Sequence, residues 1–208
     1  AGSAELAAGN MNAGYSYYQN AVMDYPQVYE SFLALSALVD AGLEVDEFQR
    51  GVVDFHASAY DAAIAAFNRY VEANPEHRED VHLYLAWSYE KLGNYDAALA
   101  QIEEYIRATE ESIQLEEGEE ANDGHQDNAD PSPSQNLDRG YIEKAKLQAR
   151  AGLSAEAIDS YLVYLEQFPG GPDAPFAAWW AAALFENMGN TADAIEAYRN
   201  LAETYPQH

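Results

Sequence analysis

Histidine and aspartate are the residues of this chain whose chemistry could bind a metal ion. Of the five histidines, only His77 and His82 lie close together, and no third ligand follows them at a metal-binding spacing. Asp123, Asp127 and Asp130 could bind Ca²⁺ loosely, but the glycine and the bidentate glutamate of a calcium-binding loop are out of place. The sequence therefore predicts neither a metal site nor a cofactor, and we interpret the acidic run as a solvated tract.

Nucleophilic and phosphate-binding chemistry has no recognisable pattern in the chain. Its 208 residues include no cysteine, which excludes thiolate nucleophiles, disulfides and cysteine-bound zinc or iron–sulfur sites. Ser-His-Asp arrangements and glycine-rich phosphate loops are also missing from the sequence. We therefore predict no catalytic residue in this chain, and any catalytic domain would lie outside it.

Basic side chains offer a different chemistry, the binding of a carboxylate. Four of the ten positive charges fall within one expected helix, at Arg139, Lys144, Lys146 and Arg150. Residues 139, 146 and 150 are spaced to share one face of that helix, where they could receive a carboxylate from a partner. They could equally pair with acids of the same chain. Candidates for such pairs are Glu90, Glu103, Glu104 and the acidic run.

The net charge of the chain limits its classes of partner. The chain has 36 acidic and 10 basic residues, which give a formal net charge of -26 at pH 7. Such a surface repels phosphate backbones, so we expect no binding to nucleic acid. We interpret the charge as a source of solubility, including in high salt or an extracytoplasmic setting, with a dedicated basic partner as the alternative. No apolar run approaches the ~20 residues that cross a bilayer, so no membrane span is expected.

An internal repeat decides which elements carry these side chains. Four segments share one frame: a glycine or small residue at a turn, alanine five residues later, and then two large apolar positions, often followed by proline. These segments are residues 58–75, 93–105, 152–169 and 189–206. The alanines are Ala63, Ala98, Ala157 and Ala194. A weaker fifth copy spans residues 9–26, with Gly14 in place of the alanine.

The frame predicts antiparallel helical hairpins. The turn residue lets the chain reverse, the small alanine lets two helices approach closely, and the proline marks the end of the second helix. The first helices are expected at about residues 45–57, 79–92, 138–151 and 174–188, with one additional helix between residues 26 and 42. We expect Asn94, Ser154 and Thr191 to cap the second helices.

The acidic run interrupts this pattern. No Lys or Arg occurs between Arg107 and Arg139, and the run also holds glycines and prolines. It predicts a solvated, disordered loop at residues 109–137, between N-terminal hairpins in residues 1–108 and a C-terminal hairpin pair in residues 138–208 of one continuous solenoid. The chain begins inside an expected helix and stops just after a repeat-ending proline, so we expect a piece of a longer protein.

The frame resembles the tetratricopeptide repeat (TPR) family over nearly all of the chain apart from the acidic run. The match is strongest in residues 79–105. Consensus positions there are filled by Leu85, Ala86, Tyr89, Gly93, Tyr95, Ala98 and Tyr105. The resemblance implies an all-α fold, a right-handed α-solenoid of about five stacked helix hairpins. It also implies a non-catalytic scaffold whose first helices line a concave groove that binds a protein or peptide.

The same resemblance implies which residues line that groove. They are Phe48, Val52, Phe55, Leu83, Trp87, Glu90, Arg139, Ile142, Lys146, Arg150, Phe176, Trp179 and Glu186. Large aromatic residues and a local basic strip are the best binding candidates among them. The alternative is that Trp87, Trp179 and Trp180 pack between helices. The Asn- and Lys-rich carboxylate clamp of chaperone-binding repeats is not reproduced, which disfavours a chaperone adaptor.

Two narrower resemblances concern the bacterial envelope. Residues 37–77 are similar to the superhelical, non-catalytic region of soluble lytic transglycosylases, which would make the chain the arm of an enzyme that cleaves peptidoglycan. Glu111 and Ser112 match the catalytic pair of that family only superficially, because no Gly-Leu-Met-Gln segment follows. The segment 168–182 resembles periplasmic repeat proteins that assist envelope assembly. Both resemblances favour an extracytoplasmic or periplasmic location over a cytoplasmic one.

Overall fold

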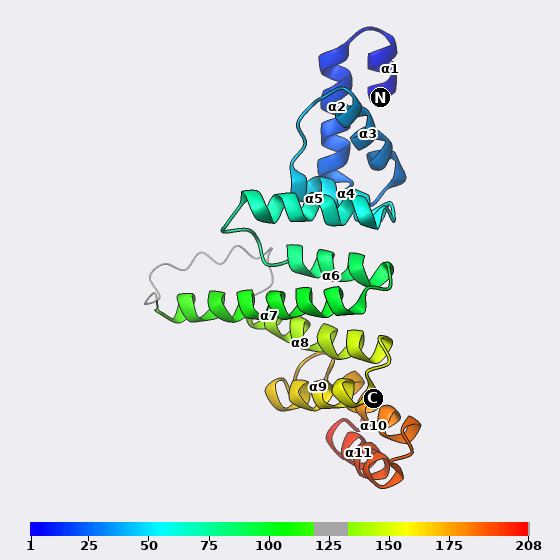
Figure 1. Ribbon diagram of the computed structural model, residues 1–208, viewed down its shortest axis with the longest axis vertical. Helices are drawn as coiled ribbons and strands as arrows, with labels where there is room; N and C mark the ends of the chain where they lie inside the picture. The colour runs from blue at the N-terminus through cyan, green and yellow to red at the C-terminus, as the bar shows by residue number, and fades with distance from the viewer. Residues whose placement is uncertain (119–132, 208) are drawn as a thin grey trace. The chain divides into compact units, whose positions relative to one another are not determined.

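Helices form the regular structure of this protein (Figure 1). The computed structural model describes the backbone of residues 1–118 and 133–207, and the side chains of residues 1–115 and 135–207. Within these ranges the helices are α1 (Gly2–Ala7), α2 (Met11–Asp24), α3 (Tyr29–Asp40), α4 (Glu47–His56), α5 (Tyr60–Ala73), α6 (Val81–Lys91), α7 (Tyr95–Gly118), α8 (Pro133–Arg150), α9 (Ser154–Gln167), α10 (Ala174–Asn187) and α11 (Thr191–Thr204). No strand occurs in these ranges, and the predicted all-α class is confirmed.

The chain divides into two compact units at the turn between α6 and α7. The first unit, Ala1–Asn94, contains α1 to α6, and the second unit, Tyr95–His208, contains α7 to α11. The predicted first helices correspond to α4, α6, α8 and α10, and the second helices to α5, α7, α9 and α11. The weaker copy, residues 9–26, corresponds to α2, which α1 precedes, and the additional helix corresponds to α3. The order of helices therefore follows the predicted frame.

The turn between two helices of a hairpin has one geometry in both units. After α8, the N–H of Leu153 donates to the carbonyl of Gln148 at 3.0 Å, and the N–H of Gly152 donates to that of Ala149 at 3.1 Å. This pair of bonds is the Schellman motif, which needs a left-handed residue after the helix. Gly152 supplies it with φ 80°, and in the turn after α4 Ser58 supplies it with φ 62°.

The turn also explains why two predicted helix caps are wrong. Ser154 and Thr191 are the first residues of α9 and α11, not their caps. The N-cap positions belong to Leu153 and Asn190, and neither side chain makes a capping bond. Because the left-handed residue ends one helix only two positions before the next begins, the cap falls directly after that residue. Ser154 and Thr191 therefore lie one position after the residues that occupy the N-cap.

The first unit has two clusters of buried side chains. One joins α2, α3 and α4 around the fully buried Leu38. The other joins α4, α5 and α6, and it includes Phe48, Phe67 and the frame alanine Ala63. A Cβ at Gly51 of α4 would collide with the ring of Phe67, so these two helices are in close contact. The small-residue seam that the frame predicts is therefore present in this hairpin.

The core of the second unit joins α8, α9 and α10. Ile142, Ala157 and Tyr161 are all at most 1% exposed in this cluster. Helices α7 and α8 are also in close contact, since a Cβ at Gly140 of α8 would lie only 2.7 Å from Cγ1 of Ile106 on α7. Close helix contact again depends on residues without a large side chain.

Both ends of the predicted acidic loop are helical, so the prediction of residues 109–137 as a loop is wrong there. α7 continues to Gly118, and α8 already begins at Pro133. Thr109 is fully buried and donates from Oγ1 to the carbonyl of Tyr105 at 2.9 Å. Tyr141 of α8 donates to Glu110 of α7 at 3.2 Å, so α8 supports the extra turns of α7. The rest of the predicted loop, residues 119–132, lies outside the described residues.

Candidate protein-binding faces

Exposed aromatic side chains of α10 lie beside a half-buried lysine of α8 in the second unit. Phe176 and Trp179 of α10 are 39% and 47% exposed, although rings of this size are usually buried. Nζ of Lys146 lies 5.1 Å from the ring centroid of Phe176, which brings α8 beside the first turn of α10. Arg139 and Arg150 are exposed on α8, at spacings that place them on the face of Lys146. We call these five residues the aromatic face.

The lysines of α8 pair with acids of their own chain. Nζ of Lys144 lies 2.9 Å from a carboxylate oxygen of Glu103 on α7. Nζ of Lys146 lies 3.3 Å from Glu143 and 3.6 Å from Asp173, which precedes α10. Intrachain pairing is therefore confirmed for Lys144 with the predicted partner Glu103, whereas Lys146 pairs with two acids outside the predicted set. Their positive charge is partly neutralised before any ligand arrives.

The adjacent tryptophans of α10 have different environments. The ring of Trp180 is half-buried and packs against the core of the second unit, with its centroid 5.9 Å from that of Phe176. The ring of Trp179 meets Trp180 edge-on at 5.0 Å and extends from the core into solvent. Packing between helices therefore accounts for Trp180, and Trp179 presents a large aromatic surface to solvent.

Four of the predicted groove residues are buried, so their prediction as ligand-contacting residues is not supported. They are Phe48, Val52, Leu83 and Ile142, none of them more than 9% exposed. Phe48 shows the physical reason, because its ring packs 5.8 Å from that of Phe67 and is covered by the guanidinium of Arg78 at 4.4 Å. Helical spacing selects one side of a helix, but it cannot tell whether a neighbouring side chain covers that side.

The remaining groove candidates are partly accessible. In the first unit, Phe55 and Trp87 are half-buried and both pack edge-on against Tyr84, with ring centroids 5.5 Å from its ring. Glu90 is also half-buried. In the second unit, Glu186 is exposed and its carboxylate accepts a hydrogen bond from Tyr198 at 3.1 Å. A binding role for these positions stays a prediction.

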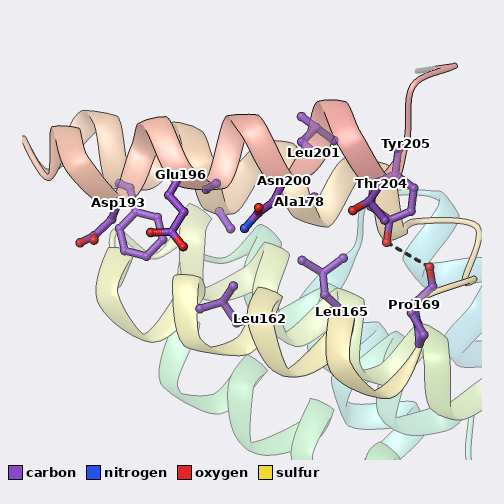
Figure 2. Close-up of a pocket in the computed structure, with 13 residues that line it drawn as sticks. Leu162, Leu165, Pro169, Ala178, Asp193, Glu196, Asn200, Leu201, Thr204 and Tyr205 are labelled. Atoms are coloured by element: carbon purple, nitrogen blue, oxygen red, sulfur yellow. Dashed lines mark hydrogen bonds between the residues drawn. The ribbon is translucent and has the colours of Figure 1, made fainter.

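A cleft between α9 and α11 escaped the sequence analysis. It has a volume of about 490 Å³, and α10 forms its floor with Ala178, which is labelled in Figure 2, and with Ala181 and Phe185. Leu162 and Leu165 of α9 and Leu201 of α11 form its apolar walls. Leu162 and Leu165 lie outside the frame positions 157, 161 and 164, so the repeat gave no reason to single them out. The sequence feature that could have located them is a pair of leucines in α9 at positions where the frame requires no large apolar residue.

The two ends of the cleft differ in polarity (Figure 2). Asp193 and Glu196 of α11 lie at one end, and the exposed Asn200 follows them along the rim. The opposite end is closed by a hydrogen bond from the hydroxyl of Tyr205 to the carbonyl of Pro169 at 3.0 Å. No lysine, arginine or histidine is among the residues that line this cleft. The cleft is therefore apolar along its floor and acidic at one end.

The first unit contains a buried carboxylate. Asp54 of α4 is 4% exposed, and burial raises its pKa to about 6 even though Arg50 and Arg69 act to lower it. Nε of Arg50 lies 3.9 Å from the carboxylate. Among the described residues, no three His, Asp or Glu side chains gather in a way that could hold a metal ion. In the same part of the chain, no helix is long and apolar enough to span a membrane.

Comparison with known proteins identifies the class of the repeats. Family models described as tetratricopeptide repeat match residues 55–116 and residues 176–208. These two segments therefore match tetratricopeptide repeats, and the resemblance drawn from the frame is confirmed. These comparisons give no support to the narrower resemblance to lytic transglycosylases, which stays a hypothesis. No curated protein matches the chain.

Solved structures agree on the fold. MamA AMB-1 is 17% identical, with a TM-score of 0.57 over 95% of this chain and 94% of its own. The apo form of RapI is 13% identical, with a TM-score of 0.62 over 93% of this chain and 70% of its own. YrrB, described as a TPR protein with an unusual peptide-binding site, is 16% identical, with a TM-score of 0.51 over 100% of this chain and 84% of its own. At these identities the likeness concerns the fold alone.

Proposed function

We propose that this protein is a non-catalytic scaffold that binds a protein or peptide through the aromatic face of α8 and α10. The observation that carries the proposal is the exposure of Phe176 and Trp179 on α10, with Lys146 of α8 beside the ring of Phe176. Exposed tryptophan and arginine are the residues that most often dominate binding energy at protein interfaces. Tetratricopeptide repeats and the peptide-binding site named for YrrB support the same class of function.

The ligand we propose for this face is an extended or helical segment with an apolar side chain next to a carboxylate. The apolar side chain would cover the exposed part of Trp179, where burial of apolar surface stabilises a complex by about 25 cal/mol per Å² before the entropic costs of association. The carboxylate would meet the guanidinium groups of Arg139 or Arg150, which favour planar, bidentate contacts. The protein would bind this ligand without catalysing a reaction, in an extracytoplasmic or periplasmic location.

The test is selection of peptides on the immobilised protein, followed by affinity measurements with single variants. Trp179→Ala should weaken a selected peptide by about tenfold or more, which corresponds to 1.4 kcal/mol or more of binding free energy. Met188→Ala is the matched control, because both side chains are 47% exposed and Met188 directly follows α10. Trp87→Ala tests the first unit in the same way. Equal affinities for Trp179→Ala and the unmodified protein would refute the proposal.

A further inference from the structure

The cleft between α9 and α11 lies on another side of α10 from the aromatic face. Its floor residues Ala178 and Ala181 are neighbours of Trp179 in sequence, but a helix turns by about 100° per residue and so separates their directions. None of the thirteen residues that line the cleft belongs to the aromatic face. Whatever binds in the cleft is therefore a second ligand of this protein or a separate segment of the same partner.

We propose that this cleft binds a short basic amphipathic segment of a partner protein, with its aliphatic side chains along the floor and its lysine or arginine side chains against Asp193 and Glu196. The proposal goes beyond the function assigned to the aromatic face and depends on a different set of residues. Three properties of the cleft define this ligand: its apolar floor, the position of its charge, and its length.

The apolar floor requires aliphatic or aromatic side chains in the ligand. Leu162 is 45% exposed at the wall, and Phe185 and Leu165 are half-buried beside it. A volume of about 490 Å³ lies within the range of ~300–1,000 Å³ that is usual for ligand sites. Filling it removes apolar surface of both molecules from water, which is the main favourable contribution to association.

The charge of the rim selects a basic ligand. Asp193 and Glu196 are both exposed and lie three residues apart on α11, so their carboxylates are neighbours at the same end of the cleft (Figure 2). Carboxylates make their strongest hydrogen bonds with ammonium and guanidinium groups. A net charge of -26 also attracts a basic segment over longer distances and speeds its association.

The length of the cleft suits about three turns of helix. Its lining extends from Asp193 of α11 to Tyr205, the residue directly after that helix, which is about 18 Å at a rise of 1.5 Å per residue. The ligand would place basic residues at the Asp193 end and apolar residues at the end that Tyr205 closes. A second copy of this chain is disfavoured, because it has 36 acidic residues against 10 basic ones, and Lys144 and Lys146 already pair internally.

The experiment uses a fluorescent helical peptide of about 12 residues, a length that matches the cleft. The peptide carries leucines three or four residues apart in one half and lysines in the other, and a second peptide has glutamate in place of each lysine. Fluorescence anisotropy with the full chain measures both affinities at two salt concentrations. We expect the lysine peptide to bind and the glutamate peptide to bind at least about tenfold more weakly, with the difference shrinking as salt increases.

Variants of the chain locate the bound peptide. Asp193→Lys combined with Glu196→Lys should weaken the lysine peptide by about tenfold or more, and Leu162→Asp should do the same through the apolar wall. Asp61→Lys combined with Glu72→Lys on α5 is the matched control, because it changes the net charge equally at two exposed positions of the other unit. Trp179→Ala should leave the affinity unchanged. Circular dichroism confirms that each variant is folded.

Several results would overturn the proposal. Equal weakening by the two charge-reversal pairs would assign binding to overall charge, and equal affinity of both peptides would remove the role of the carboxylates. Loss of binding with Trp179→Ala but not with Leu162→Asp would place the peptide on the aromatic face instead. No binding to the unmodified chain would also reject it. A dimer in sedimentation velocity that Leu162→Asp dissociates would identify a second copy as the occupant.

Discussion

The hairpin of α4 and α5 in the first unit and the hairpin of α8 and α9 in the second have the same turn geometry. They differ in the side chains at two positions of that turn. The left-handed turn residue is Ser58 in the first hairpin and Gly152 in the second. Four residues earlier, the first has Asp54 and the second has Gln148, both at most 9% exposed. The carbonyls of Asp54 and Gln148 accept the same turn hydrogen bond, at 2.8 and 3.0 Å.

The repeat frame determines the turn position of each hairpin but not its stability. The frame fixes where the chain turns, because the backbone bonds of the turn are the same in both hairpins. The free energy of each hairpin depends on side chains that the frame does not specify. A serine in the left-handed region and a buried carboxylate both cost stability, so the first hairpin carries two costs that the second avoids.

The largest effect is expected from a charge placed in the seam that both hairpins share. Ala63→Asp in α5 and Ala157→Asp in α9 each bury an unpaired carboxylate at a position with 0% exposure. An uncompensated buried charge costs about 3–5 kcal/mol, so each variant should lose most of the stability of its unit. Urea unfolding followed by circular dichroism measures the loss.

The control for this prediction lies on the same helix. Ala155→Asp introduces the same side chain at an exposed position of α9 and should change the free energy of unfolding by no more than about 0.5 kcal/mol. If Ala157→Asp and Ala155→Asp melted alike, the alanine seam would not be a packing contact. The frame would then lose its physical basis.

A smaller effect is expected from the buried carboxylate of the first hairpin. The pKa of Asp54 in the folded chain is raised to about 6, above its ordinary value of 3.8, so the folded state holds this proton more tightly. The stability that Asp54 contributes is therefore highest below about pH 4, falls as the pH rises toward 6, and is constant above that. Asp54→Asn should remove this fall and raise the free energy of unfolding at pH 7 by about 1–2 kcal/mol. This is less than the ~1.4 kcal/mol per pKa unit would give, because the asparagine amide is itself a polar group that costs free energy to bury.

The reciprocal substitution transfers the cost to the second hairpin. Gln148→Glu should destabilise α8 and α9 at pH 7 relative to pH 4.5, because burial opposes ionisation of the new carboxylate. Unfolding at both pH values, for both variants and the unmodified chain, gives a direct comparison. A stability gain of Asp54→Asn that was equal at pH 4.5 and pH 7 would contradict the role of ionisation.

Sequence reasoning located the elements better than the surfaces. The spacing of the frame predicts Ala63 and Ala157 in the helix seam, because only small residues fit a close approach, and both are buried. The family resemblance predicts Phe48 in a groove, but its ring is buried, because it is covered by Arg78, which lies 30 residues away in the chain. The cleft was missed for a similar reason, since it exists only where Leu162 of α9 faces α11. Local pattern predicts a helix face, but accessibility depends on residues distant in sequence.

The smallest effect is expected at the left-handed turn residue. Ser58→Gly should stabilise the turn after α4, because a residue with a Cβ pays about 1–2 kcal/mol in the left-handed region, whereas glycine does not. Part of this gain is lost to the greater freedom of glycine in the unfolded chain, by about 0.4–1 kcal/mol. The hydroxyl contact between Tyr60 and Ser58 at 3.3 Å is also lost. We therefore expect a net gain of about 0.5 kcal/mol.

Gly152→Ser is the matched reversal, with an expected loss of about 1 kcal/mol at the turn after α8. Differences of this size are best measured locally, by hydrogen exchange of the amides that close the turns. Exchange at Ala59, which bonds to Asp54, should slow in Ser58→Gly, and exchange at Leu153, which bonds to Gln148, should accelerate in Gly152→Ser. Faster exchange at Ala59 in Ser58→Gly would mean that the serine hydroxyl stabilises the turn by more than the left-handed backbone costs. Ser58 would then stabilise the turn of the first hairpin, and it would not be a source of instability in that hairpin.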